Sequence, residues 1–237
     1  MLGENKVIAI ILAAGSGKRM NLKYNKAFIE LDNKPILTHS ISVFEKCDLI
    51  DEIIVIGKES ELDKIKKDII DKYELSKVVN LISGGNERQD SVFNGIKNID
   101  CELDDTIVVI HDGARPFLDV DVLEKSIEKT LTSDGCIVGV PSKDTIKVIE
   151  NNVVKKTLDR NRLINVQTPQ CFKLKIIKKA YEMGKKMGVK ATDDSQLVEN
   201  IGYKVEVVIG SYDNIKITTK EDLIIGEQIL EKRKLEK

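Results

Sequence analysis

The stretch VIAIILAAGSGKRM, residues 7–20, decides the fold class of this 237-residue chain. Its first part, Val7 to Leu12, is an unbroken apolar run rich in β-branched residues, which is typical of a strand buried on both faces of a parallel sheet. The second part consists mostly of small residues and reaches two cations, Lys18 and Arg19. Because small residues let backbone amides approach a ligand closely, this loop is suited to a polyphosphate.

Further apolar segments resemble the first, and stretches with helical spacing separate them. We expect strands at Ile53 to Ile56, Thr106 to Ile110 and Cys136 to Val140, and helices at Ile36 to Phe44, Glu59 to Ile70, Ser91 to Ile99 and Val120 to Leu131. This strand-then-helix order predicts an α/β fold with a parallel, doubly wound sheet. Ligands of such sheets bind outside the carboxyl ends of the strands, so the loops there are the candidate site.

After Pro141 the pattern changes to an alternation of apolar and polar residues. Asp144 to Ile149 and Val153 to Leu158 flank Glu150-Asn151-Asn152, which is the signature of a β-hairpin. A hairpin is marginally stable alone in water, so we expect this arm, approximately residues 141–168, to pack on a partner and hypothesise a homodimer. The chain, 1–237, is predicted to be a single domain that ends with helices near Lys173 to Lys186 and Asp193 to Asn200, a strand at Lys204 to Ile209, and a helix from Lys220.

The composition excludes several classes of function. Lys and Arg total 38 against 39 Asp and Glu, a net charge of −1, so no overall positive field favours nucleic acid. The 4 cysteines are widely separated and offer no metal-ligand spacing. The apolar run at the first strand is too short to span a bilayer, and no signal-peptide pattern precedes it. We therefore expect a cytoplasmic protein with no membrane or nucleic-acid partner.

The first loop matches neither of two familiar phosphate-binding motifs. A P-loop requires glycine at Leu12 and Ser or Thr at Arg19, and the dinucleotide fingerprint requires a third glycine at Met20. A second cation, Lys26, follows and could fold back over phosphates. The alternative is a tight turn with solvated charges.

Two later loops also carry suitable groups. Gly84 to Ser91 offers flexible backbone, a hydroxyl and a guanidinium, although it could simply cap a helix. In His111 to Pro116, a carboxylate at a strand end stands beside glycine and arginine, where Mg²⁺ bridging a triphosphate would want it. The alternative there is a surface Asp–Arg pair. Neither His39 nor His111 accompanies a nucleophile elbow, so a packing or capping role is expected for both.

The hairpin region carries further polar groups. Lys143 to Thr145, Asp159 to Asn161 and Gln167 to Gln170 are expected too far along the arm to reach the first loop, and could form an acceptor-phosphate site across a dimer. Solvated hairpin ends are the alternative. Near the C-terminus, Asp213 to Thr218 supplies one more lysine.

Together these segments resemble the cytidylyltransferases that make 4-diphosphocytidyl-2-C-methylerythritol in the non-mevalonate isoprenoid pathway. The likeness runs nearly end to end, through Leu12 to Met20 with Lys26, Gly84 to Ser91, Val109 to Pro116, Asp144-Thr145, Asp159 to Asn161, Gln167 to Gln170, Ala191 to Asp193, and Asp213 to Thr218. It implies a Rossmann-like nucleotidyltransferase fold with a mainly parallel twisted sheet, a protruding β-arm for dimerisation, CTP as donor, a small polyol phosphate as acceptor, and Mg²⁺.

The resemblance also implies roles for individual residues. Those expected in catalysis are Arg19, Lys26 and Lys216. Those expected to bind the nucleotide are Ala13, Ala14, Gly15, Gly17, Gly85, Arg88 and Ser91. Those expected on the acceptor side are Asp112, Arg115, Thr145, Arg160, Thr168 and Thr192, with Asp112 also the candidate metal ligand and with Thr145 and Arg160 contributed by the opposite subunit.

The chain departs from the family pattern at two positions. Asn25 stands where proline commonly precedes the catalytic-type lysine, so we expect a less rigid loop, and Asn86 stands where an acidic residue is frequent. The expected reaction is in-line attack of the acceptor phosphate on the α-phosphate of CTP. A ribitol-5-phosphate cytidylyltransferase is the nearest alternative, and a non-catalytic nucleotide-binding regulator is the alternative of another class.

Overall fold

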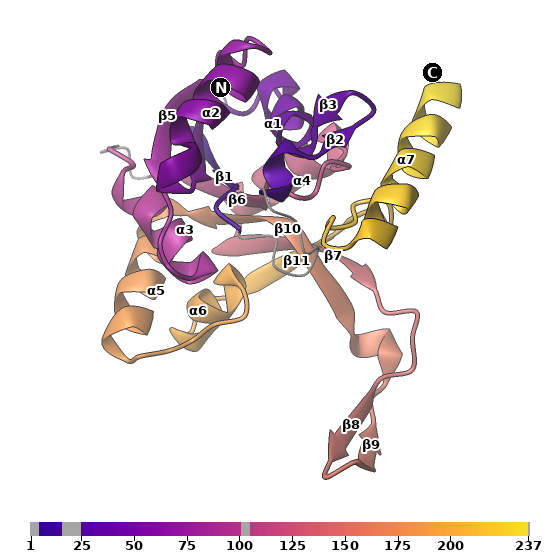
Figure 1. Cartoon of the computed structure of the whole chain (residues 1–237). Coiled ribbons are helices and arrows are strands. Elements are labelled where there is room, and N and C mark those ends of the chain that lie inside the picture. Colours follow the sequence, from indigo (N-terminus) through magenta and orange to yellow (C-terminus); the bar gives the residue numbers. More distant parts are fainter. Residues whose placement is uncertain (1–4, 16–24, 101–104, 237) are drawn as a thin grey trace.

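The computed structural model of the chain describes residues 5–15, 25–100 and 105–236 (Figure 1). Within these residues the largest sheet has seven strands in the order β11-β7-β10-β6-β1-β4-β5. The strands are β1 (Val7–Leu12), β4 (Glu52–Gly57), β5 (Val78–Ser83), β6 (Ile107–Asp112), β7 (Gly135–Pro141), β10 (Ile164–Lys173) and β11 (Val205–Ile209). All neighbouring strands pair parallel except β10, which runs antiparallel to both β6 and β7. The predicted mainly parallel α/β sheet is confirmed.

Helices cover both faces of this sheet. They are α1 (Ile36–Lys46), α2 (Leu62–Ile65), α3 (Arg88–Lys97), α4 (Val120–Leu131), α5 (Leu174–Lys186) and α6 (Asp194–Asn200), while the last helix, α7 (Lys220–Leu235), packs on a separate cluster. Alternate residues of β1 decide the two cores: Ala9 and Ile11 pack with α1, α2 and α4, whereas Ile8 and Ile10 pack with α3, α5 and α6. Since side chains of a strand alternate between faces, an apolar run without alternation requires this three-layer arrangement.

Short elements connect the layers. They are the 3₁₀ turns η2 (Lys26–Phe28), η3 (Glu59–Glu61) and η5 (Arg160–Arg162), the π-helical η4 (Lys66–Asp71), and the strand pair β2 (Glu30–Leu31) and β3 (Lys34–Pro35). The α7 helix covers a third, smaller apolar cluster built around Leu31, Phe117 and Ile217. None of the helices in the described ranges is long and apolar enough to cross a membrane.

The hairpin predicted after Pro141 is present and projects away from the sheet (Figure 1). It consists of β8 (Lys147–Glu150) and β9 (Val153–Thr157), joined at Asn151 and Asn152, which have φ of 48° and 61°. Two consecutive residues with positive φ form the tight turn that suits twisted strands, and asparagine tolerates this conformation.

The strand β10 corrects one expectation. Residues 164–168 were assigned to the arm, but they begin a strand of the central sheet, and Gln170 pairs with Ile110 and Ile137. Polar residues and Pro169 hid this strand in the sequence, because a proline argues against a central strand. The structure accommodates the proline at an irregularity in pairing between Val166 and Gln170.

Candidate functional site

A pocket of about 380 Å³ opens where β1, β5 and β6 end. Its lining comes from the first loop, the loop before α3, the end of β6 and the segment before α7. These parts are far apart in the sequence and meet because the parallel strands present their carboxyl ends on one edge. The volume falls within the range of small-molecule pockets.

The first loop contributes Ala13, Ala14 and Gly15 to this lining. The amide of Ala13 donates to the carbonyl of Ile56 at 2.7 Å, which holds the beginning of the loop beside β4. Predicted residues Gly17 and Arg19 lie outside the described residues. Lys26, the second predicted cation, is the first residue of η2.

The loop before α3 supplies Gly85 to the pocket, and the first turn of α3 supplies Arg88 and Ser91. The helix begins with a capping box, in which Glu87 is the N-cap residue. The Ser91 hydroxyl accepts the amide of Gly85 at 3.0 Å and donates to the Glu87 carbonyl, so it shapes the loop from within. Glycine is required at Gly84, where a Cβ would lie 2.6 Å from that of Ala14.

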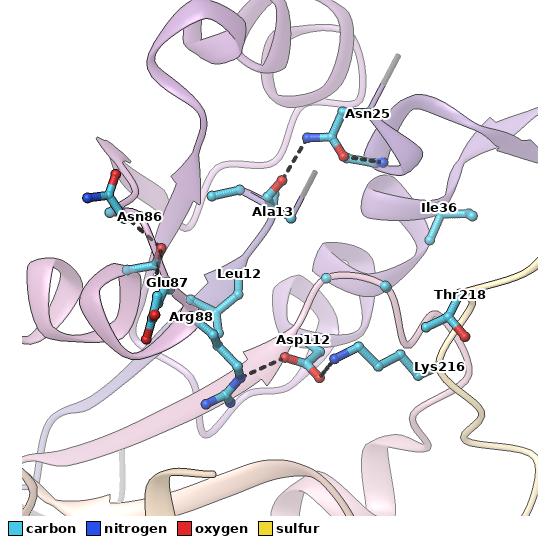
Figure 2. Close-up of a pocket in the computed structure, with 17 residues that line it drawn as sticks. Leu12, Ala13, Asn25, Ile36, Asn86, Glu87, Arg88, Asp112, Lys216 and Thr218 are labelled. Atoms are coloured by element: carbon cyan, nitrogen blue, oxygen red, sulfur yellow. Dashed lines mark hydrogen bonds and ion pairs between the residues drawn. The ribbon is translucent and has the colours of Figure 1, made fainter. Parts of the chain in front are cut away.

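Asp112, at the end of β6, lies between two cations (Figure 2). Lys216 Nζ donates to Oδ2 at 2.6 Å, and Arg88 Nε donates to Oδ1 at 3.3 Å from the other side. Burial by itself would raise the pKa of the Asp112 carboxyl, but the charges of Arg88 and Lys216 outweigh it and hold that pKa well below its usual range. The carboxylate therefore stays ionised and keeps both cations directed at the pocket.

Asp194 is a buried carboxylate that the sequence did not point to, and it holds the Arg88 guanidinium in place. The guanidinium donates to both oxygens of Asp194, at 2.9 and 2.7 Å, and Asp194 is fully buried at the start of α6. The Tyr181 hydroxyl also donates to Asp194, while Gln170 accepts the Asp194 amide. In the sequence, Asp194 follows the N-cap Asp193 and reads as an ordinary acidic first turn, so no signal distinguishes it.

Thr168 has an internal role in the structure. Its hydroxyl accepts the amide of Asp112 and hydrogen-bonds His111 Nδ1, both at 3.1 Å, and His111 Nε2 lies 3.1 Å from the Arg115 carbonyl. With Nε2 donating to that carbonyl, Nδ1 accepts the Thr168 proton, so both ring nitrogens and the Thr168 hydroxyl have partners. Burial lowers the pKa of His111 to about 4, so this histidine is neutral and braces the Asp112 loop.

The other residues predicted on the acceptor side do not line the pocket. Arg115 donates to the Asn214 carbonyl at 2.7 Å, beside the segment that carries Lys216. Thr192 is exposed and bonds Gln196 at the start of α6. Thr145 and Arg160 are exposed residues of the arm region. The structure thus brings the described residues that were predicted to bind the nucleotide to one pocket, and of the predicted acceptor-side residues only Asp112 lines that pocket.

The donor set around Asp112 can be tested against a metal ion. The described residues contain no group of three or more His, Cys, Asp or Glu side chains that could hold one. Mg²⁺, however, is commonly bound through one or two carboxylates with water and substrate phosphates, so it needs no preformed cage. The ionised carboxylate of Asp112 fits that mode, and its two oxygens accept bonds from Lys216 and Arg88 in this structure.

The doubly wound sheet, the glycine-rich first loop and the cation pair around Asp112 are the features expected of a nucleotidyltransferase. Comparison with known proteins specifies the class further. The family model described as 2-C-methyl-D-erythritol 4-phosphate cytidylyltransferase matches residues 7–232. The chain belongs to this family.

Individual relatives agree with the family match. A protein of that name from Clostridioides difficile is 51% identical over 225 residues, which is 95% of this chain and 94% of the relative. Another, from Alkaliphilus metalliredigens, is 48% identical and covers 99% of this chain and 97% of its own. The crystal structure of 4-diphosphocytidyl-2C-methyl-D-erythritol synthase from Anaerococcus prevotii matches with a TM-score of 0.84 and 36% identity, covering 96% of both chains.

Proposed function

We propose that this chain joins CTP and 2-C-methyl-D-erythritol 4-phosphate to give 4-diphosphocytidyl-2-C-methyl-D-erythritol and pyrophosphate. The observation that carries the proposal is the Lys216–Asp112–Arg88 arrangement, at 2.6 and 3.3 Å, in a pocket that begins with the glycine-rich loop. The near-complete match to the family favours this acceptor over ribitol 5-phosphate, and it favours an enzyme over a regulator.

The acceptor brings its own nucleophile, a phosphate oxygen, so the protein needs no activated serine or cysteine. In-line attack on the α-phosphorus of CTP forms one P–O bond and breaks the bond to pyrophosphate. The protein positions two anions that repel each other and neutralises the charge that develops between them. We assign this task to Lys216 in the pocket lining, to Arg19 in the first loop and to Lys26 at the beginning of η2.

The nucleotide side is formed by Ala13, Ala14, Gly15, Gly17, Gly85, Arg88 and Ser91. We assign Arg88 a supporting part, because its guanidinium already bonds Asp112 and Asp194. Asp112 would hold Mg²⁺ together with phosphate oxygens and water, and the ion would neutralise triphosphate charge when bound.

The acceptor side requires a second subunit in this proposal. The arm exposes Val148, Ile149, Val153 and Val154, an apolar surface on a hairpin that is marginally stable alone. A homodimer through the arm would cover these side chains and bring Thr145 and Arg160 toward the neighbour's Arg115, Thr168 and Thr192. We infer that the chain folds as one domain, 1–237, with this arm, and its cytoplasmic location stays a prediction.

The direct test is pyrophosphate release with CTP and Mg²⁺. Methylerythritol 4-phosphate, ribitol 5-phosphate and glucose 1-phosphate are compared as acceptors, and Lys26→Ala is the inactive control. Release with methylerythritol 4-phosphate alone, lost in the variant, supports the proposal. A preference for ribitol 5-phosphate would move the enzyme to another acceptor, and no release with any acceptor would favour a regulator.

A further inference from the structure

The side chain of Asn25 lies at the far end of the first loop and is only 2% exposed. Its Nδ2 donates to the carbonyl of Ala13 at 2.9 Å, and its Oδ1 accepts the amide of Ala27 at 3.0 Å (Figure 2). The same Nδ2 also donates to Glu61 Oε2 at 2.6 Å. Both amide protons and the carbonyl are therefore used inside the protein. Three partners of these types also fix which way the amide points, since Nδ2 faces two acceptors and Oδ1 faces a donor.

These bonds act on both ends of the loop. Ala13 directly follows β1 and Asn25 directly precedes η2, so the bond between them joins the residue at the beginning of the loop to the residue at its end. The Asn25 carbonyl also accepts the amide of Phe28 at 3.1 Å, and this bond with the one to Ala27 shapes the turn that begins at Lys26.

A separate segment holds the same turn from outside. Glu61 and Lys64 are three residues apart where η3 passes into α2, so they share one helical face. Glu61 bonds Asn25, and Lys64 Nζ lies 4.3 Å from the centre of the Phe28 ring. The turn from Asn25 to Phe28 is thus fastened at both ends to one short helical segment, which contributes no residue to the pocket lining.

We propose that Asn25 and Glu61 are positioning residues for nucleotidyl transfer, which hold the turn bearing Lys26 in place before CTP binds. The inference rests on the proposed function, in which Lys26 acts on the triphosphate. Asn25 lacks the ring of proline, but its side chain supplies three hydrogen bonds that hold the turn from Asn25 to Phe28. We call the hydrogen bonds of Asn25 to Ala13, Ala27 and Glu61 the clamp. Displacements of about 1 Å at a reacting group can cost roughly 100-fold in rate, so the clamp should affect turnover.

Exchanging the two polar groups tests the clamp. In Asn25→Asp a carboxylate would face Glu61 and the Ala13 carbonyl, and we expect kcat to fall about 30- to 100-fold. Glu61→Gln alone keeps an acceptor for Asn25 and should stay within about 3-fold of the parent rate. In the double variant the new glutamine amide can donate to the new aspartate, so at least about 10-fold of the loss should return.

The readouts separate positioning from folding. kcat and the KM for each substrate are measured per folded enzyme, with melting temperature and circular dichroism recorded for every variant. We expect kcat to change while the KM for the acceptor stays within about 3-fold. Glu61→Ala, compared with the matched Glu59→Ala on the same turn, gives a second measurement that does not depend on the folding of Asn25→Asp, and only Glu61→Ala should lower kcat, by about 10-fold.

Lys26→Ala is included so that the two ideas can fail separately. If Lys26→Ala is inactive but the double variant does not recover, or if Glu61→Ala equals Glu59→Ala, the clamp is refuted and the proposed function stands. Loss of activity only in proportion to the unfolded fraction also refutes it. If Lys26→Ala keeps the parent rate, the assigned role of Lys26 fails, and the positioning inference fails with it.

Discussion

Replacing Asp194 by asparagine should destabilise the protein strongly although it adds or removes no bulk. Asp194 is fully buried and accepts two charge-assisted hydrogen bonds from Arg88 at 2.9 and 2.7 Å, together with one from Tyr181. Asparagine would turn an Nδ2 donor toward one of these donors and leave the guanidinium without its full counter-charge. Removing one partner of a buried ion pair costs about 3 to 5 kcal/mol.

We expect Asp194→Asn to lower the free energy of unfolding by about 3 kcal/mol, the lower end of this range. The Arg88 side chain is 31% exposed and keeps Asp112 at 3.3 Å, so part of its charge remains solvated or paired. For a chain of this size, 3 kcal/mol corresponds to a fall of roughly 6 to 12 °C in melting temperature.

Urea unfolding followed by circular dichroism measures this difference. The control is Asp71→Asn, which weakens an ion pair with Lys66 between exposed side chains and should cost under about 1 kcal/mol. The costs of Arg88→Met and Asp194→Asn should not add in the double variant, because both substitutions break the same ion pair. A free energy of unfolding within about 1 kcal/mol of the parent for Asp194→Asn would refute the reasoning.

Three further outcomes are expected. Lys216→Met should lower kcat by roughly 10²- to 10³-fold in the pyrophosphate assay, with the exposed Lys220→Met as an unchanged control. Burial lowers the pKa of His111 from 6.5 to about 4, so between these pH values the unfolded chain binds a proton that the folded chain does not. The free energy of unfolding should therefore fall by up to about 3 kcal/mol as the pH drops from 6.5 to 4. The variant His111→Gln should lack this part of the pH dependence in urea unfolding. Ile149→Asp on the arm, where the side chain is 64% exposed, should give monomers in sedimentation, whereas Val79→Asp, 57% exposed on β5, should not; equal behaviour of the two would contradict dimerisation through the arm.

The strands and most helices could be predicted because their signals are local. Val7 to Leu12 has no polar residue to place at a surface, so it is buried on both faces whatever surrounds it. The hairpin of the arm was equally local, since Asn151 and Asn152 tolerate the φ values that the turn requires. The loops at the carboxyl ends of the strands followed from topology alone, and the pocket lies there.

The strand β10 could not be predicted in the same way. Its polar residues have partners that come from distant parts of the chain: Thr168 bonds His111, and Gln170 bonds the start of α6. A polar side chain in a strand is tolerated in the interior when such partners exist, and a sequence pattern does not reveal them. The same limit explains why Thr168 was expected on the arm.

By itself, the sequence determined the class of the fold and the family, and it placed the loop that is predicted to bind phosphate, because these depend on apolar periodicity and on short blocks of residues in order. Only the tertiary structure decided how the charges are used. Arg88, Asp112, Asp194 and Lys216 span more than half of the chain, and their pairing depends on which strands are neighbours in the sheet. Electrostatic and hydrogen-bond energies depend on the distance between groups in space and on their burial, and the local sequence determines neither the distance nor the burial.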